Sequence, residues 1–287
     1  MDSVNVLVDS SCLLGESPLW HPDERCLYWL DILAGKLFRY DPAKGESETC
    51  YEGDPIGGMT LQENGDLLLF MARGAVATWH EGKLTQIIKE IPDERETRFN
   101  DVIAAPDGSI FCGTMPTDSR PGRLYHLSCG GELTIVLEGI GISNGLGFTI
   151  DGLGLYYTDS AKGEIYQFDY GRSSGEISNQ RVFVSSTEPA DGIPDGLTVD
   201  RDGYVWSCRW DGGCIIRYTP EGVEDRRIEL PARQVTSLVF AGTGLRQLFV
   251  TSAGGEDREA NGVSAGALFR VESGVEGVPE QRSKIDV

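Results

Sequence analysis

A pattern of short β-prone segments repeats six times along this chain, and this repeat constrains the fold more than any other feature. Each copy is a turn followed by a run of aliphatic and aromatic residues. The copies are centred on Tyr28, Leu68, Ile110, Tyr156, Val205 and Leu248. The intervals between these markers are 40, 42, 46, 49 and 43 residues. Because a repeat of about 40–50 residues with several short strands is typical of a propeller blade, the sequence predicts an all-β, six-bladed β-propeller.

The number of strands and the closure of the ring follow from the same repeat. A β-sandwich also contains many short strands, but it gives no reason for six copies in the same register. Each copy is preceded by a further strand, such as residues 195–200, and followed by outer strands, such as residues 215–218, which predicts about four strands per blade. We expect residues 4–8, a spare strand ahead of the first copy, and residues 267–271 of the last copy to close the ring in one mixed blade. Residues 1–287 are predicted to form a single domain.

Charge and hydropathy limit the partners of the protein. The chain has 25 basic and 45 acidic residues and a net charge of −20, which repels phosphate backbones and anionic lipids. The N-terminal segment lacks the basic region and the apolar core of a signal peptide, and no apolar run approaches the roughly 18 residues of a membrane span. We therefore expect a cytoplasmic protein that binds neither nucleic acid nor membranes. The sequence carries no signal of an oligomeric state.

Cysteine and histidine usage argues against a zinc-finger type of site. The seven cysteines are odd in number, contain no Cys-x-x-Cys pair and fall partly in apolar strand-like runs, which predicts reduced, structural thiols. The three histidines, His21, His80 and His126, lie far apart in the sequence and have no cysteine partner. A thiolate or imidazole metal site is therefore not expected.

Four segments carry an oxygen-bearing side chain at nearly the same phase of the repeat, and each segment alone is typical of a turn. The side chains are Glu16, Asn100, Asn144 and Asp195, which precede their markers by 12, 10, 12 and 10 residues. Propeller blades are related by rotation about the central axis, so equivalent positions at the start of the innermost strands converge on the channel mouth. We therefore expect one cluster in the central channel.

The residue types in this cluster predict a metal site. Carboxylate and amide oxygens favour Ca²⁺, Mg²⁺ or Mn²⁺, and Zn²⁺ can bind through the carboxylates. Glu16, Asn144 and Asp195 are the predicted inner ligands, and three protein ligands leave positions for water and substrate, as a catalytic metal requires. A structural ion that holds the blades together is the alternative. In the two remaining blades, Gly57-Gly58 and Thr236-Ser237 are small residues that we expect to leave space for a cavity.

Two other motifs are excluded by their context. Gly141-Ile-Ser-Asn-Gly145 matches Gly-x-Ser-x-Gly, but a nucleophile elbow leads from a strand into a helix, and strand-like residues 146–150 follow here. Asp200-Arg-Asp202-Gly203 resembles the start of a calcium loop, but Val205 occupies the sixth position, where a glycine must turn the chain. The first match is predicted to be accidental and the second to be a hairpin turn.

Seven short motifs occur in order along nearly the whole chain. They are Gly15-Glu-Ser-Pro18, Arg98-Phe-Asn-Asp101, Gly113-Thr-Met115, Ile142-Ser-Asn-Gly145, Tyr156-Tyr-Thr-Asp-Ser160, Ile193-Pro-Asp-Gly196 and Gly212-Gly213. In this order they resemble the regucalcin, gluconolactonase and luciferin-regenerating-enzyme (senescence-marker-protein) family. The resemblance implies a six-bladed propeller of the metal-dependent lactonase type with metal ligands at Glu16, Asn144 and Asp195. It also implies substrate-binding residues at Arg98 and Asn100.

Two departures from the regucalcin pattern bear on the identity of the sugar. Arg209-Trp-Asp211 follows Cys208, where the animal proteins resemble Cys-Tyr-Asn-Gly-Gly, so the chain looks like the bacterial sugar-lactonase branch. The loop Met115-Pro-Thr-Asp118 also differs in detail. The resemblance carries Met115 and Asp118 over as substrate contacts.

The resulting hypothesis is hydrolysis of small sugar lactones by metal-activated water, with Asp195 as the general base. Arg98 and Asn100 would hold sugar hydroxyls through directed hydrogen bonds, although Arg98 could instead form an ion pair with Glu96 or Asp101. Two alternatives stay open at this point. Similar propellers with an axial calcium hydrolyse aryl esters or phosphotriesters, and a calcium-binding propeller without enzymatic activity would use its central ion structurally.

Overall fold

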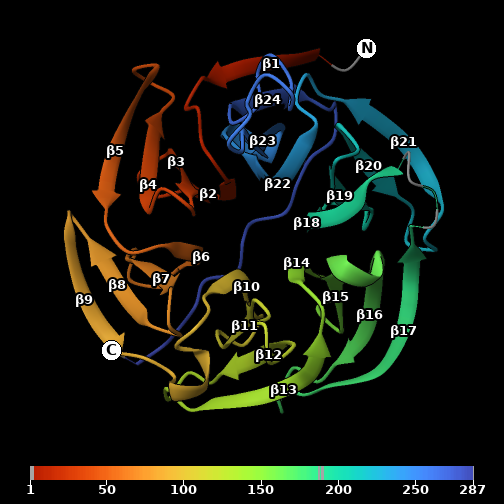
Figure 1. The fold of residues 1–287 in the computed structure, drawn as a ribbon. Helices are drawn as coiled ribbons and strands as arrows, with labels where there is room; N and C mark the ends of the chain where they lie inside the picture. Colours follow the sequence, from red (N-terminus) through yellow and green to blue (C-terminus); the bar gives the residue numbers. More distant parts are fainter. Residues whose placement is uncertain (1–2, 187, 189–190, 287) are drawn as a thin grey trace.

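The computed structural model describes residues 3–186, 188 and 191–286, whose strands form six four-stranded antiparallel sheets around a central axis (Figure 1). In each sheet one strand lies at the axis and the others follow outward to the rim. The predicted all-β, six-bladed propeller is therefore confirmed. We number the blades 1 to 6 in chain order.

The first three blades are consecutive meanders. Blade 1 comprises β2 (Gly15–His21), β3 (Cys26–Asp31), β4 (Lys36–Asp41) and β5 (Glu46–Glu52). Blade 2 comprises β6 (Ile56–Leu61), β7 (Leu67–Met71), β8 (Val76–His80) and β9 (Lys83–Ile88). Blade 3 comprises β10 (Phe99–Ala104), β11 (Ile110–Thr114), β12 (Gly122–Leu127) and β13 (Leu133–Ile140).

The next two blades repeat this arrangement, and the sixth draws on both ends of the chain. Blade 4 comprises β14 (Ser143–Phe148), β15 (Gly154–Asp159), β16 (Glu164–Tyr170) and β17 (Ile177–Ser185). Blade 5 comprises β18 (Ile193–Val199), β19 (Val205–Trp210), β20 (Cys214–Tyr218) and β21 (Glu224–Glu229). Blade 6 comprises β22 (Gln234–Ala241), β23 (Gln247–Ala253), β24 (Leu268–Glu272) and β1 (Ser3–Val8).

The mixed sixth blade confirms the predicted closure of the ring. Strand β1 pairs antiparallel with β24, with Ser3 opposite Glu272 and Val4 opposite Val271. The outermost strand of the last blade is therefore the first strand of the chain (Figure 1).

The second strand of each blade carries the repeat signal because it is buried along all or nearly all of its length. Strands β3, β7, β11 and β15 are buried along their whole length, whereas the outer strands β5 and β9 contain no buried residue. A strand covered on both faces reads as a continuous apolar run in the sequence. Apolar clusters fill the space between each pair of adjacent blades, so the core is a ring of interfaces.

Helical structure in the described residues includes three single 3₁₀ turns, η1 (Pro92–Glu94), η2 (Ser160–Lys162) and η4 (Thr243–Leu245). No helix of the described part is long and apolar enough to cross a membrane. All seven cysteines are free thiols, in agreement with the sequence.

Each inner strand shifts register against its neighbour at the position of the predicted ligands. The shift falls between Glu16 and Leu19 in β2 and between Asn144 and Leu146 in β14. The other four inner strands have the same irregularity. A β-bulge re-aims side chains and bends the strand. The segments predicted as turns therefore lie inside strands, where their turn-forming residues build bulges instead.

The C-terminal segment crosses the axis of the propeller after β24 (Figure 1). At one end Gly277 forms an antiparallel bridge with Asp200 of blade 5. At the other end the Ser283 hydroxyl lies 2.9 Å from the Thr60 hydroxyl of blade 2, and Ile285 is buried against blades 2 and 3. Residues 278–281 lie between these two attachments.

Candidate active site

The four predicted oxygen-bearing residues lie on four inner strands and are all buried. Glu16 is on β2, Asn100 on β10, Asn144 on β14 and Asp195 on β18, and each is at most 6% exposed. The bulge in each strand places the side chain at the same level of the ring. The repeat phase therefore located residues that occupy equivalent positions in the fold.

Hydrogen bonds join blades 3 and 4 at this level. The Asn100 amide nitrogen donates to the Asn144 side-chain oxygen at 2.8 Å and to the Ser143 carbonyl at 2.7 Å. The Arg98 guanidinium donates to the Asn100 side-chain oxygen and to the Phe99 carbonyl. Both amide protons of Asn100 are therefore in use, and only its oxygen remains for a ligand.

The site concentrates buried negative charge. Burial raises the pKa of the Glu16 carboxyl well above its usual range, and the charges of Asp195 and Asp101 add to this rise. Burial, with the charge of Asp101, also raises the pKa of Asp195. Burial raises the pKa of Asp101 to about 7, although the nearby Arg98 opposes the change. Burial is the largest cause of all three shifts, and charges of neighbouring carboxyls add to the rise in the pKa of Glu16 and of Asp195.

The donor set fits one divalent cation. The Asp195 Oδ1 atom is buried and has no hydrogen-bond partner among the described residues. When charged, the carboxylates of Glu16, Asp101 and Asp195 and the Arg98 guanidinium leave two negative charges, which one divalent ion would neutralise. Within the described residues no group of three or more His, Cys, Asp and Glu side chains is arranged to hold a metal. The side chains that could hold such an ion are the carboxylates of Glu16 and Asp195 and the amide oxygen of Asn144, all of them buried.

The glycines near the axis do not leave space, contrary to the expectation from the sequence. A Cβ atom on Gly57 would lie 1.9 Å from the Phe99 carbonyl oxygen, and one on Gly145 would lie 2.5 Å from the Asp195 carbonyl oxygen. Neighbouring inner strands thus approach so closely that only glycine fits. These glycines bring blades together, whereas Ser237, which was also expected to leave space, lines a cavity on the axis.

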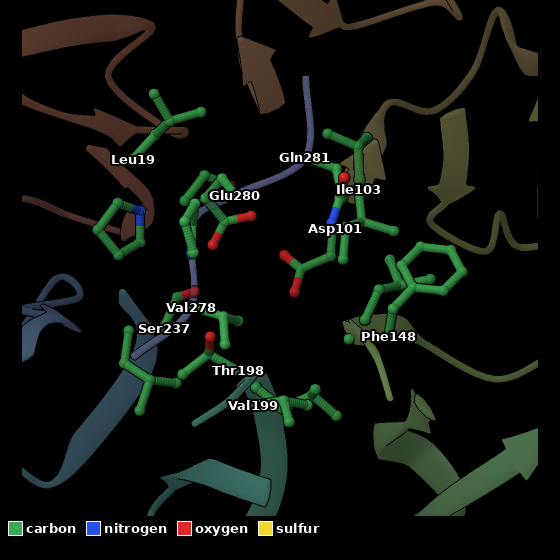
Figure 2. Close-up of a pocket in the computed structure, with 18 of the residues that line it drawn as sticks. Leu19, Asp101, Ile103, Phe148, Thr198, Val199, Ser237, Val278, Glu280 and Gln281 are labelled. Atoms are coloured by element: carbon green, nitrogen blue, oxygen red, sulfur yellow. The ribbon is translucent and has the colours of Figure 1, made fainter. Parts of the chain in front are cut away.

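A cavity of about 300 Å³ does lie on the axis, farther along the inner strands than the predicted ligands (Figure 2). Its walls include Leu19, Ile103, Phe148 and Val199, which follow the ligand positions in β2, β10, β14 and β18. Residues 278–281 of the C-terminal segment also line it. Figure 2 shows the carboxylates of Asp101 and Glu280 directed into this space.

The predicted substrate contacts lie at the opposite end of the inner strands, where β10 begins. The Met115 N–H donates to the Arg98 carbonyl at 3.0 Å, so these two residues are adjacent. Asp118 is exposed on the turn between Thr117 and Arg120. Arg98 forms no ion pair with Glu96 or Asp101 among the described contacts, because its donors bind the Asn100 oxygen and the Phe99 carbonyl.

The sequence did not identify several supporting residues. Asp31 and Asp159 are buried and lie opposite Gly15 and Ser143, the residues before Glu16 and Asn144. Ser160 accepts a hydrogen bond from the Asn144 amide. The sequence did contain a signal for the two aspartates, because each lies three residues after the marker of its repeat, Tyr28 or Tyr156.

Arg209 explains one departure from the regucalcin pattern in structural terms. Its side chain is fully buried in blade 5, where it donates to the Ser186 hydroxyl at 2.6 Å and to the Tyr218 hydroxyl. It is paired with Pro194, next to Asp195. The departure therefore places a buried, hydrogen-bonded side chain on the strand next to the one that carries Asp195.

Comparison with known proteins agrees with this architecture. A family model described as the SMP-30/Gluconolactonase/LRE-like region matches residues 14–254. The chain belongs to this family. Pentonolactonase XacC of Haloferax volcanii is 44% identical over 99% of both chains, and regucalcin of Gallus gallus is 34% identical over 93% of both. The crystal structure of regucalcin from Agrobacterium tumefaciens, named a calcium-binding protein, superposes with a TM-score of 0.91 at 25% identity, covering 99% of this chain and 98% of the other. The resemblance seen in the sequence motifs to the SMP-30/gluconolactonase family is confirmed.

Proposed function

We propose that this member of the SMP-30/gluconolactonase family is a metal-dependent lactonase that hydrolyses small sugar lactones. The observation that carries the proposal is the buried Asp195 Oδ1 atom, which has no partner among the described residues and lies near two further buried carboxylates. The name of the Haloferax relative, a pentonolactonase, supports the class of reaction. The name of the Agrobacterium structure, a calcium-binding protein, supports a bound cation.

Glu16, Asn144 and Asp195 would hold this cation through oxygen atoms. Such donors favour Ca²⁺, Mg²⁺ or Mn²⁺ and also accept Zn²⁺. When bound, the ion would polarise the lactone carbonyl and lower the pKa of a water molecule. Three protein ligands leave room for substrate, so we propose a catalytic ion instead of a purely structural one.

The remaining chemistry belongs to the side chains. Asp195 accepts a proton from the attacking water as the water oxygen bonds to the acyl carbon. When the bond from the acyl carbon to the ring oxygen breaks, the proton passes to that oxygen, which gives the open hydroxy acid. Arg98 donates to sugar hydroxyls with the N–H groups that Asn100 and Phe99 leave free, and the Asn100 oxygen accepts from a hydroxyl. Met115 and Asp118 complete the proposed substrate contacts.

The test is lactone hydrolysis followed by proton release. Protein stripped with a chelator is supplied with Ca²⁺, Mg²⁺, Mn²⁺ or Zn²⁺ singly and assayed on a panel of aldonolactones. We expect at least one metal to restore turnover, and we expect Asp195→Ala to lower kcat by about 10²–10⁴-fold, the usual contribution of a general base. Asp169→Ala, in the exposed outer part of blade 4, is the control and should leave kcat unchanged.

Three results would contradict the proposal or a part of it. Turnover of aryl esters or phosphotriesters without any lactone turnover would assign a different reaction to the same site. If no substrate turns over but calcium raises the melting temperature, the ion is structural and the protein is a calcium-binding propeller. Full activity of Asp195→Ala would remove Asp195 from its role as base.

A further inference from the structure

A series of hydrogen bonds crosses three blades at the level of the proposed ligands. The series begins with Arg98, the residue directly before β10, whose guanidinium donates to the Asn100 side-chain oxygen. It continues with the Asn100 amide nitrogen, which donates to the Asn144 side-chain oxygen. The Asn144 amide nitrogen donates to the Ser160 hydroxyl at 2.9 Å. The Ser160 hydroxyl then donates to the Pro194 carbonyl at 2.6 Å. Ser160 is therefore the link between blade 4 and blade 5.

The two ends of this series fix the direction of each bond. A guanidinium group only donates and a backbone carbonyl only accepts. If the Asn144 amide were reversed, its nitrogen would face the Asn100 nitrogen, and the Ser160 hydroxyl could not donate to both Asn144 and Pro194. Two buried donors would then oppose each other, at a cost in free energy. The Asn144 oxygen is therefore held on the side of Asn100.

The position of Ser160 connects two proposed ligands that come from different blades. Ser160 is 6% exposed and begins η2, directly after β15. Its hydroxyl touches the side chain of Asn144 and the carbonyl of the residue before Asp195. We propose that Ser160 is a positioning residue that orients the Asn144 oxygen and sets its spacing from Asp195, so that both bind one cation. This inference rests on the proposed metal site.

A second buried serine provides a matched comparison. Ser109 is 2% exposed, and its hydroxyl donates to Asp107 within the turn before β11. Ser109 touches none of the proposed ligands. Removal of the Ser160 hydroxyl leaves the buried Asn144 amide without its partner, whereas Asp107 is exposed and still accepts the Ser109 N–H. Ser109→Ala should therefore lower stability less than Ser160→Ala. Only the loss of Ser160 should change cation binding.

The experiment is calorimetric titration of chelator-stripped protein with Ca²⁺ and with Mn²⁺, without substrate. Wild type, Ser160→Ala, Ser160→Thr and Ser109→Ala are compared, and thermal melting of each metal-free variant is recorded. We expect Ser160→Ala to raise the Kd about 10–100-fold, the usual effect of losing a partner of a metal ligand. Ser160→Thr keeps the hydroxyl and should recover most of the affinity, and Ser109→Ala should bind like wild type.

Each result of these titrations tests a specific part of the proposal. A Kd of Ser160→Ala within about twofold of wild type overturns the role of Ser160 while the metal site stands, since changes of that size fall below the expected effect. A wild-type protein that binds none of the cations overturns both the site and this inference. If Ser160→Ala does not fold, Ser160→Cys replaces it, because a thiol is only a weak donor and acceptor. An unchanged Kd in folded Ser160→Cys would overturn the proposal as well.

Discussion

Blades 1 and 4 each use a carboxylate of their own to hold the residues before the ligand-bearing strand, whereas the equivalent position of blade 5 is an arginine. In blade 1 the Asp31 carboxylate accepts the N–H groups of residues 13–14, directly before β2. In blade 4 the Asp159 carboxylate accepts the N–H groups of residues 141–142, directly before β14. The same arrangement thus precedes Glu16 in one blade and Asn144 in another.

Blade 5 has an arginine in the place of these aspartates. Arg209 is paired with Pro194, which has no N–H to donate to a carboxylate. The Pro194 carbonyl instead accepts from Ser160 of blade 4. The Gly15 and Ser143 carbonyls also accept from a neighbouring blade, from Thr236 and Asn100. The three blades therefore share the contact across a blade interface, and blades 1 and 4 add a carboxylate of their own. The difference shows that equivalent ligand positions in a repeat need not share their support.

The largest effect is expected when the carboxylates of blades 1 and 4 are removed. Asp31→Ala and Asp159→Ala each remove a buried carboxylate and leave two partly buried N–H groups without their acceptor, which should lower the free energy of unfolding by about 2–4 kcal/mol. Asp31 accepts a third N–H, from Ala34, so Asp31→Ala should cost more. Thermal melting of the metal-free variants measures this order. A larger loss in Asp159→Ala would contradict the hydrogen-bond account.

A smaller loss of stability is expected when a substitution forces blade 5 away from blade 4. In Gly145→Ala the new methyl group would lie 2.5 Å from the Asp195 carbonyl oxygen, so the two inner strands must move apart. We expect a loss of about 1–3 kcal/mol, the usual cost of overpacking, together with weaker cation binding. Gly130→Ala is the control, because nothing lies within 4 Å of its added methyl group. Cation affinity equal to wild type in Gly145→Ala would show that the spacing of blades 4 and 5 does not matter.

The smallest effect concerns blade 3. Among the described residues, the side chain of Asp101 has neither a supporting carboxylate in its own blade nor a supporting hydrogen bond from a neighbouring blade. Its pKa is raised to about 7 in the folded protein and is about 4 in an unfolded chain. Between these values the folded state binds more protons, so the stability of the metal-free protein falls as the pH rises. Melting at pH 5 and pH 8 should show a decrease that is smaller in Asp101→Asn by a few degrees, because about 1 kcal/mol shifts the Tm by roughly 2–4 °C. Equal decreases in both proteins would contradict the raised pKa.

The fold and the position of the candidate site could be predicted because both depend on the repeat. Marker strands such as residues 26–31 are buried on both faces, so their apolar runs recur visibly. Once six blades are assumed, rotation about the axis brings Glu16, Asn144 and Asp195 to one level. The bulges could not be predicted, because Asn-Gly and Asp-Gly pairs favour turns as well as bulges.

The hydrogen bonds that support the ligand residues could not be predicted from the sequence, for a different reason. Ser160 lies in the motif that ends β15, but its two partners come from Asn144 and from a residue of the next blade. Such a contact depends on the distance between blades, which the glycines near the axis set. Gly57 was predicted to leave space, yet the Phe99 carbonyl fills the position of a side chain there. A position where two backbones approach each other closely cannot be recognised from a periodic pattern in a single sequence.

The pairing of β1 with β24 has a consequence for how the protein is made. Ser3–Val8 leaves the ribosome about 260 residues before Leu268–Glu272, which corresponds to roughly 13–50 s at about 5–20 residues per second. During that interval the first strand has no partner and is an open edge that other chains could pair with. Blades 1 to 5 contain only consecutive strands and can form in order as the chain emerges. The inner strands can therefore converge on a finished channel only after translation of the last blade.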